Sequence, residues 1–184
     1  MRGAARPSYL PDWERYKHSV QFWATCTWLA ARCGRLGPIL DGRVTYELMA
    51  GFWPTADMAP SSTKLMVECA HIRRDMPKIV YSRTLQRAEW NSTIVRNVVA
   101  DDVLELKAQP GGDLLFAGAD LAATFMRQDL IDEYRLYVHP VVIGPGKPLF
   151  PASDTRGSVS NSPRPGAFGS GVVLLKYRRP DSRP

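Results

Sequence analysis

Two short glycine-containing motifs carry residue types that could bind a phosphate group. In the first, Gly118 interrupts an apolar run, Leu114–Phe116, just before a segment with helical spacing. A glycine between a strand and a helix lets the first backbone N–H groups of the helix reach an anion. The second motif is Gly-Arg-Val-Thr, residues 42–45, at another expected helix start. Each motif alone also fits an ordinary strand-to-helix turn, so both interpretations stay open.

Arginine and hydroxyl side chains add to these two motifs. Arg43 places a permanent, fork-shaped cation beside a helix N-terminus, which itself carries about half a positive charge. A third motif, Ser82-Arg83-Thr84, follows the predicted strand Lys78–Ser82. One guanidinium and two hydroxyls can hold a dianion through charge-assisted hydrogen bonds. The alternative for this motif is a simple turn at the end of a strand.

The elements that must position these motifs alternate between strands and helices. We expect helices over residues 13–31 (capped by Asp12), 43–52, from Ser61 or Ser62 to about Arg74, from Asp101 or Asp102 to Ala108, and 119–127. We expect strands at 39–40, 78–82, 93–96, 114–116, 133–143 and 172–177. This order predicts an α/β fold.

Composition limits the class of protein. A chain of 184 residues with 45% apolar residues suits one domain with a real core. No apolar run approaches the ~18 residues of a membrane span, and no secretory signal is recognisable. Cys26, Cys33 and Cys69 are odd in number and lack metal-finger spacing, which favours free thiols, a reducing cytoplasmic setting and no metal site.

The net charge of +6 is concentrated at the two ends of the chain. Residues 44–155 carry a net charge of −3, whereas residues 1–43 carry +4 and residues 156–184 carry +5. A basic tail can bind polyanions weakly. However, no basic helix face or aromatic platform is visible, so we expect no specific nucleic-acid partner.

The segment LIDEYRLYVHPVVIGPGKPLF, residues 130–150, together with the glycine motifs resembles the dihydrofolate reductase-like superfamily. The resemblance is closer to bacterial proteins similar to the reductase C-terminal domain of riboflavin biosynthesis. It covers Gly42 to Pro151 and resumes at Phe168 to Tyr177. It implies a single α/β domain with a mixed, twisted sheet flanked by helices. We expect a divergent, helical N-terminal segment (1–38), the reductase domain (39–178) and a basic tail (179–184).

The resemblance also implies an NADPH-dependent reductase that passes a hydride to a C=N, C=C or C=O carbon of a small pterin- or pyrimidine-like substrate. It implies a homodimer as well. The expected cofactor contacts are Gly42, Arg43, Thr45, Ser82, Arg83, Thr84, Gly118 and Ala119, with residues 82–84 reading the adenosine 2′-phosphate. No catalytic acid can be named. One alternative is a non-catalytic relative that binds nucleotide or only dimerises, and the other is a globular core with a nucleic-acid-binding tail.

Two regions depart from the family pattern. The family opens with a strand and a Ser-Leu-Asp-Gly-like turn near the nicotinamide, and residues 1–38 contain neither. Residues 156–167 lose strand alternation. One interpretation is a shifted reading frame or a mis-chosen start, which would leave the sheet one strand short with an exposed edge. The other is a genuine variant whose N-terminal helix replaces the strand.

Overall fold

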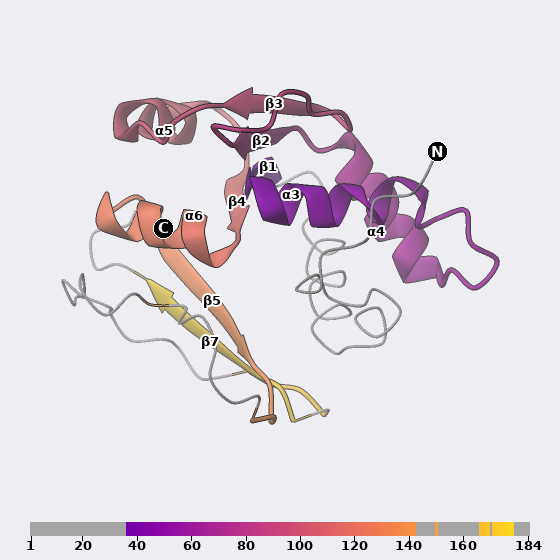
Figure 1. The fold of residues 1–184 in the computed structure, drawn as a ribbon. Helices are drawn as coiled ribbons and strands as arrows, with labels where there is room; N and C mark the ends of the chain where they lie inside the picture. Colours follow the sequence, from indigo (N-terminus) through magenta and orange to yellow (C-terminus); the bar gives the residue numbers. More distant parts are fainter. Residues whose placement is uncertain (1–35, 143–149, 151–165, 170, 179–184) are drawn as a thin grey trace.

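A computed structural model describes residues 36–142, 150, 166–169 and 171–178. Four parallel strands form one sheet in the order β3-β2-β1-β4, and three antiparallel strands form a second sheet in the order β5-β7-β6 (Figure 1). The predicted helix over 13–31, the last residue of the predicted strand 133–143 and residues 156–165 lie outside the described residues.

The element bounds follow the predicted alternation. The strands are β1 (Leu36–Gly42), β2 (Lys78–Tyr81), β3 (Ser92–Val95), β4 (Asp113–Ala117), β5 (Glu133–Val138), β6 (Gly166–Ala167) and β7 (Val173–Arg178). The α-helices are α3 (Arg43–Ala50), α4 (Lys64–Asp75), α5 (Ala100–Ala108) and α6 (Ala119–Arg127), and a 3-10 turn, η1, spans Trp53–Thr55.

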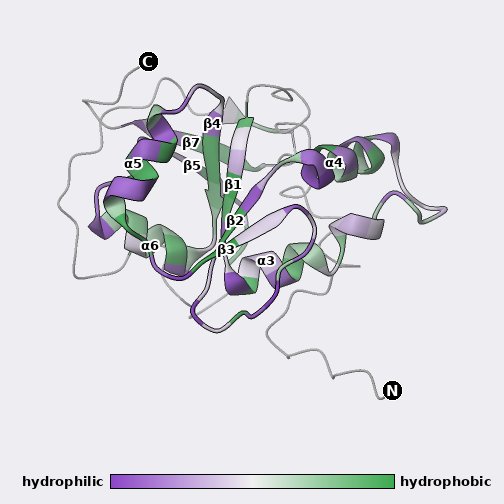
Figure 2. Ribbon diagram, turned by 90° about the horizontal axis from the view of Figure 1, so that it is seen from above, coloured by the Kyte–Doolittle hydropathy of each residue, from purple (hydrophilic) through white to green (hydrophobic). Residues whose placement is uncertain are grey.

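Helices cover both faces of the parallel sheet. Figure 2 shows α5 and α6 on one side of the sheet and α3 and α4 on the other. The alternation of β1 matches this arrangement, because Ile39 packs with Ile72 of α4 while Leu40 packs with Leu121 and Phe125 of α6. A parallel sheet buried on both faces is the usual α/β solution. The predicted fold class, an α/β domain with a sheet flanked by helices, is confirmed.

The starts of β1 and α4 differ from the sequence prediction for local reasons. Strand β1 begins at Leu36 and includes Gly37 and Pro38, because a register shift between Leu36 and Ile39 accommodates the proline. The cap of α4 is Thr63, whose hydroxyl accepts a hydrogen bond from the backbone N–H of Met66 at 3.3 Å. The predicted caps, Ser61 and Ser62, are therefore wrong.

Strand β5 ends at Val138, earlier than predicted. Pro140 has no N–H to donate, and the N–H of Val141 bonds to the carbonyl of His139 at 2.8 Å, as in a tight turn. The chain beyond β5 exposes apolar side chains, with Val141 63% and Val142 100% exposed. Within the described part of the chain, no helix is both long and apolar enough to cross a bilayer.

Candidate functional site

The two glycine motifs meet at one edge of the parallel sheet. Strands β1 and β4 are neighbours, and Asp41 is the register partner of Ala117, so Gly42 and Gly118 follow adjacent strand ends. Helix α3 begins directly after Gly42 and helix α6 directly after Gly118. Neither helix has a side-chain cap hydrogen bond at its N-terminus. Two sets of first-turn N–H groups are therefore open to an acceptor at the same edge.

Gly118 and Thr45 are in direct contact. Gly118 has a φ of +103°, a conformation that side-chain-bearing residues rarely adopt. A Cβ built on Gly118 would lie 2.6 Å from the Oγ1 atom of Thr45, closer than such atoms approach in proteins. The absence of a side chain at position 118 is therefore what lets the start of α3 approach the start of α6. The structure thus brings together Gly42, Thr45, Gly118 and Ala119.

Arg43 lies at the same edge but is already paired. Its Nη1 atom lies 3.0 Å from Oε2 of Glu47, one turn further along α3, and both side chains are more than 40% exposed. Exposed pairs at this spacing contribute only about 0.3–0.5 kcal/mol. An incoming phosphate could therefore displace Glu47 from Arg43 at little cost. Asp120, in the first turn of α6, is exposed and adds a negative charge near this edge.

The third motif follows β2, the other neighbour of β1. The register pairs Gly42 with Tyr81, so residues 82–84 begin one strand away from Gly42 at the same edge. Ser82 is buried, and its Oγ accepts hydrogen bonds from the N–H groups of Thr84 and Leu85 at 3.3 and 2.9 Å. The Ser82 hydroxyl therefore shapes the turn. Arg83 and Thr84 are exposed at its tip.

Arg96, which sequence reasoning missed, holds this turn in place. Its guanidinium donates to the carbonyl of Ser82 at 3.1 Å and to the carbonyl of Leu85 at 2.6 Å. Arg96 directly follows β3, the parallel neighbour of β2. The only signal in the sequence was a basic residue at the end of a short strand, and its meaning depends on a pairing that the sequence does not display.

A buried charged cluster lies beneath this edge and was also missed. Asp41, at the end of β1, is 3% exposed, and burial raises its pKa to about 6 although the charges of Arg73 and Lys78 act to lower it. Burial, followed by the charge of Arg73, lowers the pKa of Lys78 to about 8. The Lys78 ammonium donates to the Met76 carbonyl at 2.7 Å and lies 4.1 Å from the centre of the Trp90 ring.

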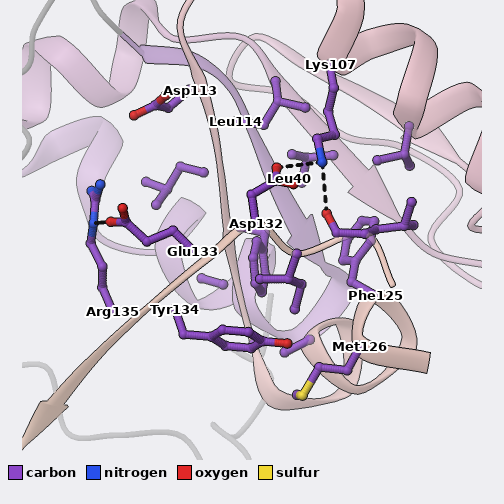
Figure 3. Close-up of a pocket in the computed structure, with 18 of the residues that line it drawn as sticks. Leu40, Lys107, Asp113, Leu114, Phe125, Met126, Asp132, Glu133, Tyr134 and Arg135 are labelled. Carbon is purple, nitrogen blue, oxygen red and sulfur yellow. Dashed lines mark hydrogen bonds and ion pairs between the residues drawn. The ribbon is translucent and has the colours of Figure 1, made fainter. Parts of the chain in front are cut away.

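A cavity of about 800 Å³ runs along the side of β4 that faces away from β1, between α5, α6 and β5. Its apolar wall includes Leu40, Phe116 and Phe125, and Figure 3 shows Lys107 and Asp132 meeting beside it. Their Nζ and Oδ2 atoms are 2.5 Å apart. One end of the cavity reaches Gly118 and Ala119. Asp41 does not line the cavity.

Among the described residues, no three His, Cys, Asp or Glu side chains are grouped to hold a metal ion.

Comparison with known proteins places this geometry in a family. The family model of the RibD C-terminal domain matches residues 35–164. The chain is 33% identical over 145 residues to the uncharacterized protein YyaP of Bacillus subtilis (strain 168), a match that covers 78% of this chain and 74% of YyaP. The chain is also 48% identical over 46 residues to the uncharacterized protein YwjB of the same organism. This shorter match covers 24% of this chain and 26% of YwjB.

A solved structure supports the same fold. A putative riboflavin biosynthesis protein from Shewanella sp. PV-4 superposes with a TM-score of 0.59 at 21% identity, and the match covers 92% of this chain and 84% of that chain. Identity this low supports the fold alone. The family match spans more than half of the chain, and its residues include all three motifs at the sheet edge. The chain therefore belongs to the RibD C-terminal domain family.

Proposed function

We propose that the chain binds NADPH at the edge formed by the ends of β1, β2 and β4, and acts as a reductase on a small unsaturated substrate. The observation that carries this proposal is the contact between Gly118 and Thr45. It brings two uncapped helix N-termini together at one sheet edge. Membership of the RibD C-terminal domain family, whose fold is related to that of reductases, supports the reaction class.

The residues at this edge fit the charge of a dinucleotide. The N–H groups at the starts of α3 and α6, with the Thr45 hydroxyl and Arg43, suit the pyrophosphate. Arg83 and Thr84 are exposed one strand away, which is about 5 Å, so they suit the 2′-phosphate of the adenosine. We assign Ser82 and Arg96 to the shape of that loop, because their hydrogen bonds lie within it.

NADPH, when bound, supplies the hydride, and the protein supplies binding and orientation. Gly118 and Thr45 would fix the pyrophosphate, and Arg83 would fix the adenosine end. The substrate class that we propose is a pterin-like or pyrimidine-like molecule, or another small molecule with a C=N, C=C or C=O bond. We assign no side chain as the proton donor.

The test compares two cofactors and two arginines of one loop. We expect NADPH to bind at least ~10-fold tighter than NADH, because one charge-assisted contact contributes about 1.5–3 kcal/mol. Arg83→Ala should remove most of this preference. Arg87→Ala is the control, since Arg87 is 84% exposed and pairs with Glu89. Equal affinity of the unmutated protein for both cofactors would refute the assignment of Arg83.

A second candidate function is nucleotide binding without catalysis. It is favoured by the position of β4. Among the described strands, β4 is the last one of the parallel sheet. On the side away from β1, Gly118 is therefore bordered by a cavity and not by another described strand. Oxidation of NADPH with a panel of pterin, pyrimidine and carbonyl substrates separates the two functions. A protein that binds NADPH tightly but oxidises none of it with any substrate fits the second.

A further inference from the structure

Two consecutive residues of α3 contact the elements on either side of this helix. Thr45 meets Gly118 at the start of α6. Tyr46, the next residue, is 5% exposed, and its hydroxyl lies against the backbone of Glu89. Successive residues of a helix point about 100° apart, so a single turn of α3 can reach both neighbours. The first turn of α3 is therefore held between α6 and segment 82–91, which connects β2 to β3.

The Tyr46 hydroxyl makes two hydrogen bonds with one residue of this segment. It donates to the Glu89 carbonyl at 2.9 Å and accepts from the Glu89 N–H at 2.8 Å. In an antiparallel sheet, a residue of the neighbouring strand would satisfy the same two backbone groups. Within the described part of the chain, these are the only hydrogen bonds between α3 and segment 82–91.

The turn that follows Glu89 is strained and needs this support. Trp90 and Asn91 have φ angles of 62° and 52°, in the left-handed region that favours glycine. Such strain persists only where neighbouring contacts hold it. Asn91 is held on the far side of the turn, since its Nδ2 atom donates to the Asp75 carbonyl at 2.9 Å. Tyr46 holds the near side of the turn through Glu89.

The same segment carries Arg83 near its other end. The Ser82 hydroxyl and the Arg96 guanidinium fix residues 82–85 through their hydrogen bonds. Only residues 86–88 separate this anchor from Glu89, and a link of that length spans at most roughly 10 Å. The position of Glu89 against α3 therefore limits where the turn that carries Arg83 can lie.

We propose that Tyr46 is a positioning residue that sets the distance between the pyrophosphate end and the 2′-phosphate end of the cofactor site. The proposal rests on the proposed function and assigns Tyr46 no contact with the cofactor. The hydroxyl holds α3, which carries Arg43 and Thr45, against the segment that carries Arg83. NADPH would make contacts at both ends, whereas NADH lacks the 2′-phosphate. The link therefore contributes more to the preference for NADPH than to dinucleotide binding in general.

Tyr46→Phe tests this role, because it keeps the buried ring and removes only the hydroxyl. In equilibrium titrations, affinity for NADPH should fall at least ~5-fold and affinity for NADH less than ~2-fold, since the lost hydrogen bonds release only the Arg83 end. Ser62→Ala is the matched control. It also removes a hydroxyl that donates to a backbone carbonyl, that of Ala56 at 2.5 Å, but it lies outside the three motifs. It should leave both affinities within about 2-fold.

Two results of these titrations would overturn the role of Tyr46. One is an unchanged preference for NADPH in Tyr46→Phe, and the other is an equal loss for both cofactors, which a merely structural role would give. Either result leaves the proposed function standing if the unmutated protein prefers NADPH. An unmutated protein that binds neither cofactor would refute the proposed function, and the role of Tyr46 in cofactor preference would fall with it.

Hydrogen exchange of the free protein tests the link without any cofactor. Tyr46→Phe removes the acceptor of the Glu89 N–H, whereas the Ser82 hydroxyl, which accepts from the N–H groups of residues 84–85, is untouched. All three amides should nevertheless exchange at least ~3-fold faster in the variant, because the segment is released as a unit. Faster exchange at Glu89 alone would show that the segment does not transmit the change, and would overturn the proposal.

Discussion

Replacing Gly118 with alanine should destabilise the protein by two separable effects. The first is backbone strain, since a non-glycine residue at a φ of +103° costs about 1–3 kcal/mol. The second is the collision of the new Cβ with Oγ1 of Thr45 at 2.6 Å, and overpacking of this kind costs about 1–3 kcal/mol. We expect the free energy of unfolding to fall by about 2–4 kcal/mol in Gly118→Ala.

A double substitution separates these two effects. Thr45→Ala removes the colliding oxygen, and the Cβ of Thr45 lies at an ordinary 3.7 Å from the place that a Cβ on residue 118 would occupy. Thr45→Ala alone should change the free energy of unfolding by less than about 1 kcal/mol. The double variant should recover at least about 1 kcal/mol of the loss, which is the coupling energy of the pair, while the strain remains.

Urea unfolding at constant m-value measures all four proteins of this cycle. Gly169→Ala is the control, because a Cβ there meets nothing within 4 Å and the residue has no positive φ. We expect the control to lie within about 0.5 kcal/mol of the unmutated protein. If Gly118→Ala behaves like Gly169→Ala, or if Thr45→Ala rescues none of the loss, the contact between the two motifs is refuted.

Three further predictions concern other parts of the molecule. In the folded protein the pKa of Asp41 is about 6, against an ordinary value of 3.8, so the folded state is more stable when Asp41 is protonated. The free energy of unfolding should therefore fall by up to about 3 kcal/mol as the pH rises from about 4 to 6. Asp41→Asn should remove this slope in urea titrations at each pH, whereas Glu105→Gln, at an exposed position of α5, should keep it. Arg96→Ala should release the turn after β2 and lower NADPH affinity about 10-fold in equilibrium titrations, because two carbonyls lose their donor; unchanged affinity would contradict this. We also expect a homodimer through the exposed apolar residues that follow β5, so Val142→Asp should give a monomer by light scattering; a monomeric unmutated protein at micromolar concentration would contradict this.

Sequence reasoning predicted the elements with strong local signals. Helix α6 spans Ala119–Arg127 as predicted, because Gly118 ends the preceding strand and the apolar spacing runs uninterrupted to Arg127. Strand β5 is shorter than its apolar run, because Pro140 has no N–H to donate to a neighbouring strand. The hydrophobic pattern of the sequence does not show this missing donor. The start of β1 was missed by three residues, since a bulge lets a strand contain Gly37 and Pro38.

The candidate site was predictable only where its parts are consecutive in sequence. The motifs around Gly42 and Gly118 were identified from glycine, arginine and threonine at helix starts, and their proximity follows once β1 and β4 are neighbours. The roles of Arg96 and Lys78 depend on the register of β2 against β3 and on the packing of Trp90. Such long-range contacts leave no local pattern, so the sequence could not reveal them.

The most direct measurement of cofactor binding at this edge is hydrogen exchange with and without NADPH, followed residue by residue. We predict slower exchange at residues 43–46, 82–85 and 118–121, where the three motifs meet at one sheet edge. We predict no change within α4, which contains none of the three motifs. NADH should slow exchange at the first and third segments with little effect at the second. Saturating NADPH that leaves all three segments unchanged would contradict the proposed cofactor site.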